Sequence, residues 1–323
     1  MANSAKPSGV TLSPVQARAE VIAATPIACQ EINKFSEKVF KTRGGRMGSG
    51  MGVLLEALWA YYVDQGRPAR VAGNEGWEVG WLPDNEYNDF ACVQCDKPWE
   101  PATKKGEFFR IEAKSMNKDA DESKGHFDEL QQNLAELDLL LVLIWAWKPI
   151  DRGRVSPIIL DQFIGSTRSI AILRDKLHIA RGGSFVDKKH CPDGCKPRAC
   201  THHGEPLNSA GNRERLSGPV SRKPKGSSIG ANFGGLMRML KTSSAEARKV
   251  FREARAADEP VHSFISFIHR NFPSEEENCY LAKDWKEAAA SLGIDVEKLS
   301  RETIIKKVRE FSEYMEVLRK LKE

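Results

Sequence analysis

Residues 108–114 read FFRIEAK and combine the apolar pattern of a strand with an acid-x-Lys triplet at its end. We predict a strand over residues 108–116, in which side chains two positions apart point to the same face. Glu112 and Lys114 should therefore lie together, while Ala113 points into the packing behind them. The three other acid-x-Lys triplets lie in turn-like or helical patterns, so only this one is expected to present both charges on one strand face.

The elements predicted around this stretch make a mixed α/β core with a helical C-terminal region. Residues 139–147 read LLLVLIWAW, which is typical of a central buried strand. Further strands are predicted at residues 90–95, 155–160 and 169–179. Helices are predicted at residues 14–41, which Pro26 interrupts, at 51–63, at 129–137 and from 232 to the end. Because residues 51–63 are apolar almost all round, this helix should be buried.

Four regions follow from these patterns. An N-terminal helical region covers residues 1–42 and the α/β core covers residues 43–189. A basic insertion rich in Cys and His covers residues 190–230, and a helical region covers residues 231–323.

Composition and charge restrict the class of protein. The chain has 323 residues, of which 41% are hydrophobic and 29% charged, as in ordinary globular proteins. No apolar run reaches the roughly 18 residues of a membrane span, and residues 1–9 lack the apolar core of a signal peptide. We therefore expect a soluble, cytoplasmic protein without a membrane partner. The net charge is +5, and the Lys and Arg side chains gathered in residues 206–241 form either a polyphosphate-binding surface or a solvated loop.

Asp89, Glu112 and Lys114 suit the hydrolysis of a phosphodiester. Asp89 directly precedes one predicted strand and Glu112 lies on the next, so the two carboxylates can share a divalent cation such as Mg²⁺. Lys114 can position or help to deprotonate the attacking water and offset charge in the transition state. The alternative is a surface ion pair between Glu112 and Lys114 on an edge strand.

With this constellation, residues 50–147 resemble the PD-(D/E)xK nuclease superfamily and, within it, the type II restriction endonucleases. That core comprises a helix, a strand hairpin carrying the motif, a second helix and a further strand. The resemblance implies a restriction-endonuclease-like mixed sheet flanked by helices. It also implies Mg²⁺-dependent cleavage of double-stranded DNA, with Asp89 and Glu112 as metal ligands and Lys114 beside the water, and a homodimer matching a palindromic site.

Two positions near this motif leave alternatives open. Many members of the superfamily carry an extra acid on the first helix, which implies a catalytic role for Glu56; its alternative is a rim ion pair with Arg43 or Arg46. Asn88, not Pro, precedes Asp89. Asp84, which follows a proline, therefore remains an alternative metal ligand.

Residues 190–203 contain three Cys and three His. Cys191, Cys195 and Cys200, together with His203 or the neighbouring His202, can supply the four N/S ligands of a structural Zn²⁺. Such a site would hold together a loop that has few apolar residues. The alternative is a reduced, exposed loop.

Basic residues on either side of the core are candidate DNA contacts. The zinc site would hold the loop that follows it against the DNA backbone or base edges, and a Gly-rich turn before the first core helix could also reach phosphates. The candidates are Arg43, Arg46, Arg213, Arg215, Arg222 and Lys223. The predicted function is sequence-specific DNA cleavage; the alternatives are a repair or recombination nuclease on the same core, or a non-catalytic, zinc-stapled DNA-binding protein.

The last predicted helices carry a spaced apolar face. Its members are Ile304, Val308, Phe311, Met315 and Leu318, at alternating intervals of four and three residues. This face is either a dimer contact or part of the core of the chain itself.

Overall fold

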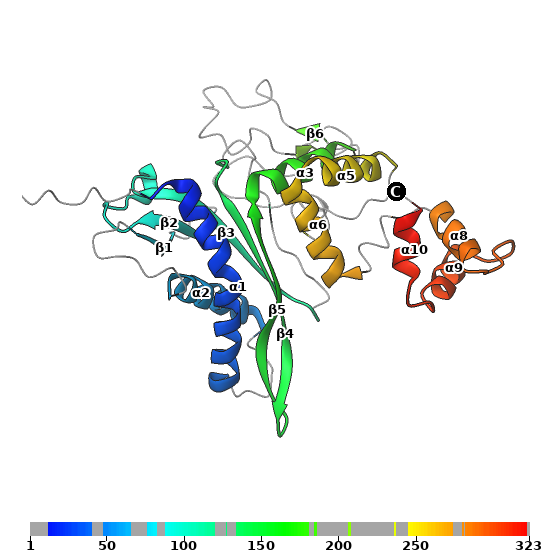
Figure 1. Ribbon diagram of the computed structural model, residues 1–323, viewed down its shortest axis with the longest axis horizontal. Helices are drawn as coiled ribbons and strands as arrows, with labels where there is room; N and C mark the ends of the chain where they lie inside the picture. Colours follow the sequence, from blue (N-terminus) through cyan, green and yellow to red (C-terminus); the bar gives the residue numbers. More distant parts are fainter. Residues whose placement is uncertain are drawn as a thin grey trace, which may run out of the picture.

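The computed structural model describes most of the chain. The described residues are 12–40, 48–65, 76–82, 88–119, 127, 134–180, 184–185, 206–207, 236, 245–273, 280 and 282–321. They form an α/β arrangement in which helices cover both faces of a five-stranded mixed sheet (Figure 1).

The sheet consists of β1 (Trp77–Trp81), β2 (Phe90–Gln94), β3 (Glu107–Asn117), β4 (Leu139–Asp151) and β5 (Arg154–Ser166), in that spatial order. Only β3 and β4 pair in parallel, whereas the other neighbours are antiparallel. The predicted strands at 90–95, 108–116, 139–147 and 155–160 are confirmed. Strand β1 was not predicted, because its Gly- and Trp-rich surroundings indicate turns.

Helices α1 (Pro14–Val39) and α2 (Gly48–Gln65) cover one face of the sheet (Figure 1). Ser13 and Gln16 form a capping box at the start of α1, and the helix continues through Pro26 without ending there. The expectation that the second helix is buried all round is wrong. Val53 and Tyr61 are each 58% exposed, because α2 packs on the sheet and α1 along one side only.

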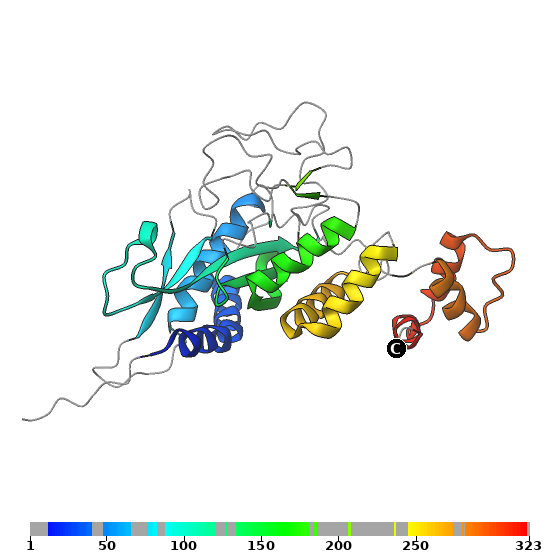
Figure 2. The ribbon, with the colours of Figure 1, turned by 90° about the horizontal axis from the view of Figure 1, so that it is seen from above.

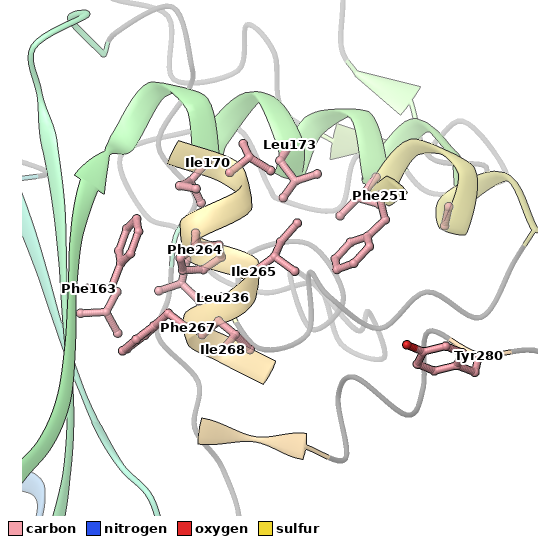
Figure 3. Close-up of a cluster of buried hydrophobic side chains, with 14 of the residues drawn as sticks. Phe163, Ile170, Leu173, Leu236, Phe251, Phe264, Ile265, Phe267, Ile268 and Tyr280 are labelled. Atoms are coloured by element: carbon pink, nitrogen blue, oxygen red, sulfur yellow. The ribbon is translucent and has the colours of Figure 1, made fainter. Parts of the chain in front are cut away.

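Helices α3 (Thr167–Ala180), α5 (Ala245–Ala257) and α6 (Glu259–Asn271) cover the other face. The strand predicted at residues 169–179 is wrong, since this segment is α3. Its apolar residues Ile170, Leu173 and Leu177 recur at helical spacing and are buried on one side. Figure 3 shows Ile170 and Leu173 lying above Phe264 of α6 in this core.

The segment between β3 and β4 does not form the predicted helix over its described part. Residues 134–138 form a bend and a turn, closed by the Asp138 N–H donating to the Ala135 carbonyl over 3.3 Å. Residues 129–133 of that prediction lie outside the described residues.

The C-terminal region is helical, as predicted, with α8 (Ala282–Ser291), α9 (Arg301–Val308) and α10 (Tyr314–Lys320). Seen from above, these helices lie beyond α5 and α6, at the end of the molecule away from β1 and β2 (Figure 2). Ile304, Val308 and Leu318 are fully buried within the chain. These three members of the face therefore belong to the core of the chain itself and Met315 packs against that core, whereas Phe311 is only partly buried.

Three short elements complete the described structure: a 3₁₀ turn at Pro101–Thr103, and the strand pair β6 (Ser184–Phe185) and β7 (Pro206–Leu207). No helix among the described residues is long and apolar enough to cross a bilayer.

Candidate functional site

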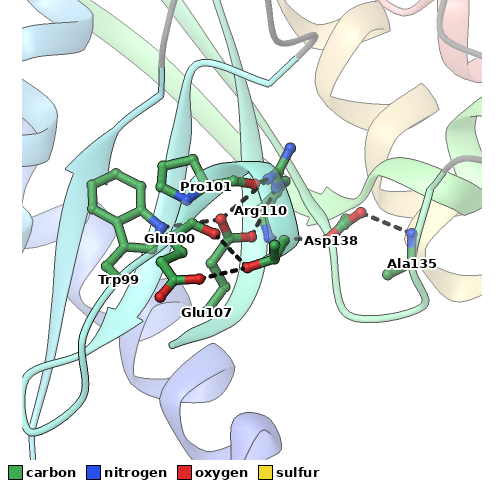
Figure 4. Close-up of polar contacts among 8 residues, drawn as sticks. Trp99, Glu100, Pro101, Glu107, Arg110, Ala135 and Asp138 are labelled. Atoms are coloured by element: carbon green, nitrogen blue, oxygen red, sulfur yellow. Dashed lines mark hydrogen bonds and ion pairs between the residues drawn. The ribbon is translucent and has the colours of Figure 1, made fainter. Parts of the chain in front are cut away.

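A buried polar network fixes the beginning of β3 and the loop that joins it to β2 (Figure 4). The Arg110 guanidinium donates to Glu107 Oε2 over 2.8 Å and to the Pro101 carbonyl over 2.6 Å. Trp99 Nε1 donates to the same Glu107 carboxylate over 3.0 Å. The Arg110 N–H donates to Asp138 Oδ1 over 2.9 Å, just before β4 begins. This network sets β3 beside β2 and β4, and so positions the residues that follow Arg110.

Asp89 lies where the pairing of β2 with β3 begins. Phe90 is the first residue of β2 and pairs with Ile111 of β3. Immediately before it, Asp89 Oδ2 accepts a hydrogen bond from the Ala113 N–H over 2.8 Å. A side-chain oxygen thus takes the place of a backbone acceptor along this edge of β3. Asp89 is thereby held directly beside Glu112 and Lys114.

Glu112 and Lys114 share one face of β3, as the strand alternation predicts. They pair in register with Leu140 and Val142 of β4, and their side chains form an ion pair. The Glu112 side chain is only 2% exposed and that of Lys114 is 21% exposed. Because β3 lies inside the sheet and Glu112 is buried, the alternative of a surface ion pair on an edge strand is wrong. Ala113 packs on the opposite face with α1 and α2, as expected.

Glu56 of α2 contacts β3 on the face of the sheet opposite to that of Glu112 and Lys114. Its Oε1 accepts a hydrogen bond from Ser115 Oγ over 2.9 Å. The described partner of Glu56 is thus Ser115, whereas Arg43 and Arg46 lie outside the described residues.

The charges of these groups affect one another. Burial raises the pKa of the Glu112 carboxyl to about 8; the Lys114 ammonium opposes this shift, and the carboxylates of Asp89 and Glu56 add to it. Burial also raises the pKa of Glu56, which the hydrogen bond from Ser115 opposes. For Lys114, burial acts to lower the pKa, but the three carboxylates together outweigh it and raise this pKa. Lys114 therefore carries its positive charge at neutral pH.

The carboxyl groups of Glu112, Asp89 and Glu56 all act on the single ammonium group of Lys114, and Glu112 Oε2 is buried without a hydrogen-bond partner among the described residues. An uncompensated carboxylate oxygen in the interior is costly unless a cation or donor reaches it. Among the described residues, no group of three or more His, Cys, Asp and Glu side chains is arranged to hold a metal ion. Mg²⁺, however, usually takes only one or two protein carboxylates and completes its shell with water and phosphate. The donor set of Asp89 and Glu112 fits this ion.

The structure brings Asp89 and Glu56, which are distant in the sequence, together with Glu112 and Lys114 of β3. The other predicted site residues lie outside the described part of the chain: Asp84, Arg43, Arg46, Cys191, Cys195, Cys200, His202, His203, Arg213, Arg215, Arg222 and Lys223.

Sequence reasoning missed two residues of this site, Ser115 and Gly52. A side-chain carbon placed on Gly52 would lie 2.5 Å from Ser115 Oγ. Gly52 and Glu56 are four residues apart on α2 and so share one helix face, which is the only sequence signal that relates them. Ser115 gives no such signal, because its role depends on how α2 packs against β3.

Comparison with protein-family models, with curated proteins and with solved structures gives no match. The assignment of a function therefore depends on the geometry of this site.

Proposed function

We propose that this protein is a Mg²⁺-dependent endonuclease that cleaves double-stranded DNA at specific sites, as a type II restriction endonuclease of the PD-(D/E)xK superfamily does. The observation that carries the proposal is the grouping of Asp89, Glu112 and Lys114 at one edge of β3, with Glu112 buried and one of its oxygens without a partner in the described part of the chain. A bound cation would offset the cost of keeping this carboxylate oxygen in the interior.

The order of elements supports the same proposal. Helix α2 precedes the β2–β3 hairpin, with β1 between them, and β4 then follows and pairs in parallel with β3. This is the order of the restriction-endonuclease-like core except for its second helix, which the described residues 134–138 do not form. Asp89 and Glu112 lie on the hairpin, at the positions that the superfamily motif assigns to metal ligands.

In this function, Asp89 and Glu112 would hold the Mg²⁺. A bound Mg²⁺ would supply positive charge against the phosphate and make water more acidic. Lys114 carries a proton at neutral pH, so its role is to orient the attacking water by donating a hydrogen bond and to offset negative charge in the transition state. The Asp89–Ala113 hydrogen bond keeps the first carboxylate fixed relative to the second.

Two further parts of the proposal concern residues outside the described part of the chain. A structural Zn²⁺ bound by Cys191, Cys195, Cys200 and His203 would hold the basic loop that follows, and this loop would contact DNA. The protein would act as a homodimer on a palindromic site. Ile304, Val308 and Leu318 would not supply the dimer contact, since they are buried within the chain.

The test is incubation of the purified protein with supercoiled plasmid and Mg²⁺, followed by gel electrophoresis. Site-specific cleavage gives discrete fragments. A smear of fragments would instead indicate a repair or recombination nuclease. Retained DNA binding without any cleavage would contradict the proposal and favour a non-catalytic DNA-binding protein.

A further inference from the structure

Gly52, Glu56 and Ser115 form a contact between α2 and β3 that the proposed reaction does not by itself require. Ser115 Oγ donates a hydrogen bond of 2.9 Å to Glu56 Oε1. Gly52 precedes Glu56 by one helical turn and faces the same hydroxyl. A side-chain carbon at position 52 would approach Ser115 Oγ to 2.5 Å, closer than real side-chain carbons come, while the Ser115 Cβ would be 3.7 Å away.

The glycine is informative because it lies inside a helix. Glycine in a helix interior is destabilising relative to alanine, since it loses more backbone freedom on folding. Gly50, two residues earlier, has no atom of the described residues within 4 Å of its missing side chain, so α2 as a whole does not demand small residues. The close approach of Ser115 is a specific reason for glycine at position 52.

We infer that Ser115 is a positioning residue, which holds Glu56 beside the Asp89–Glu112 cation site, and that Gly52 provides the space its hydroxyl needs. The inference rests on the proposed function for the presence of a cation. Asp89 and Lys114 lie close enough to Glu56 for their charges to affect its carboxyl. The Ser115 N–H also forms a hydrogen bond with Glu56. The hydroxyl and the N–H of one residue together keep the Glu56 carboxylate in one orientation.

The role of the space at Gly52 is tested by a double-mutant cycle in chemical denaturation. Gly52→Ala should lower the unfolding midpoint in the wild-type background, because the new methyl group displaces the Ser115 hydroxyl. In a Ser115→Ala background the nearest atom is the Cβ at ordinary contact distance, so the same substitution should leave the midpoint unchanged or raise it. Gly50→Ala is the matched control and should not lower the midpoint in either background. Equal effects of Gly52→Ala in the two backgrounds would overturn this part of the inference.

The positioning role is tested by calorimetric titration of the DNA-free protein with Ca²⁺, which takes the same oxygen ligands as Mg²⁺. Loss of one hydrogen bond to a charged group should raise the Ca²⁺ dissociation constant about tenfold in Ser115→Ala. Gly52→Ala should have a similar effect, whereas Gly50→Ala should have none. Ser115→Thr keeps the hydroxyl and should recover most of the lost affinity.

The outcomes separate the two proposals. A wild-type protein that binds Ca²⁺, with Ser115→Ala binding equally well, would overturn the positioning role alone. The same holds if Ser115→Thr loses as much affinity as Ser115→Ala, because the hydroxyl would then be irrelevant. A wild-type protein that binds no Ca²⁺ would overturn the proposed cation site, and the positioning role with it.

Discussion

Among the residues of the candidate site, Glu112 is expected to lower the stability of the folded protein. Its carboxyl is buried and its pKa is raised to about 8 in the folded protein, against about 4.3 for an exposed glutamate. A group whose pKa is raised on folding contributes stability that is fully present below the unfolded pKa and is lost as the pH rises through the folded pKa. In the absence of a divalent cation, Glu112 should therefore destabilise the protein at neutral and alkaline pH.

We accordingly expect Glu112→Gln to become more stable than the wild type as the pH rises from about 5 to about 9. Glutamine keeps the shape of the neutral side chain and cannot ionise. The measurement is guanidinium unfolding of both proteins in EDTA across this range. Glu100→Gln, in an exposed ion pair with Lys105, controls for the loss of a carboxylate. A wild type that gains stability over Glu112→Gln as the pH rises would contradict the burial argument.

The residues of the site differ in how far the sequence reveals them. Glu112 and Lys114 could be predicted to share a face, because alternation along a strand is a local property. The position of Asp89 followed from the strand that begins at Phe90. Ser115 and Gly52 could not be found in this way, since their contact depends on the packing of a helix against a sheet.

At the scale of elements, α1 packs on β5 and is also hydrogen-bonded to it through one amide side chain. Asn33 Nδ2 donates to the Ile159 carbonyl over 2.9 Å, and the Ile159 N–H donates to Asn33 Oδ1 over 2.8 Å. The register between β4 and β5 shifts at this point. Asn33 therefore provides both hydrogen bonds that a neighbouring strand would otherwise provide to Ile159.

Asn33→Leu should lower the free energy of unfolding by about 2 kcal/mol, because it leaves the Ile159 N–H and carbonyl without these partners. Chemical denaturation measures this change. Lys34→Ala is the matched control on the same helix; it removes only an exposed ion pair with Glu31 and should change the stability by about 0.5 kcal/mol or less. Equal stability of Asn33→Leu and the wild type would show that water or a shift of β5 replaces the amide.

Elements were predictable from the sequence where their apolar pattern is long and unambiguous. The run at residues 139–147 gives β4 directly. The segment at residues 169–179 was wrongly predicted as a strand, because its content of apolar residues is compatible with either element and only their spacing indicates a helix. Ile170, Leu173 and Leu177 fit a helix and not a strand.

At the scale of the whole molecule, one continuous core joins the helices that cover β4 and β5 to the C-terminal helices. Leu318 of α10, close to the end of the chain, is fully buried in it. The pattern of apolar residues in the sequence was enough to predict an α/β core followed by a helical C-terminal region. The side of the sheet that each helix covers was not, because it depends on contacts between residues far apart in the sequence.

Leu318→Ala should therefore lower the free energy of unfolding by about 2–5 kcal/mol, as for other buried leucines. Its sedimentation behaviour should remain that of the wild type, because the face of Leu318 packs inside the chain. A change in oligomeric state with unchanged stability would mean that this face is a contact between subunits. Lys320→Ala, in an exposed pair with Glu316, serves as the control.

The central claim is that Asp89 and its neighbours on β3 form a cation-dependent phosphodiesterase site. The most direct test is the rate of Mg²⁺-dependent plasmid cleavage by Asp89→Asn. Asparagine retains an oxygen that can accept from the Ala113 N–H, so the fold should persist while the metal-binding charge is lost. Asp96→Asn, at an exposed position in the β2–β3 loop, is the control. We predict a loss of at least about a hundredfold for Asp89→Asn and none for Asp96→Asn. Wild-type cleavage by Asp89→Asn, particularly with an inactive Asp84→Asn, would contradict the account.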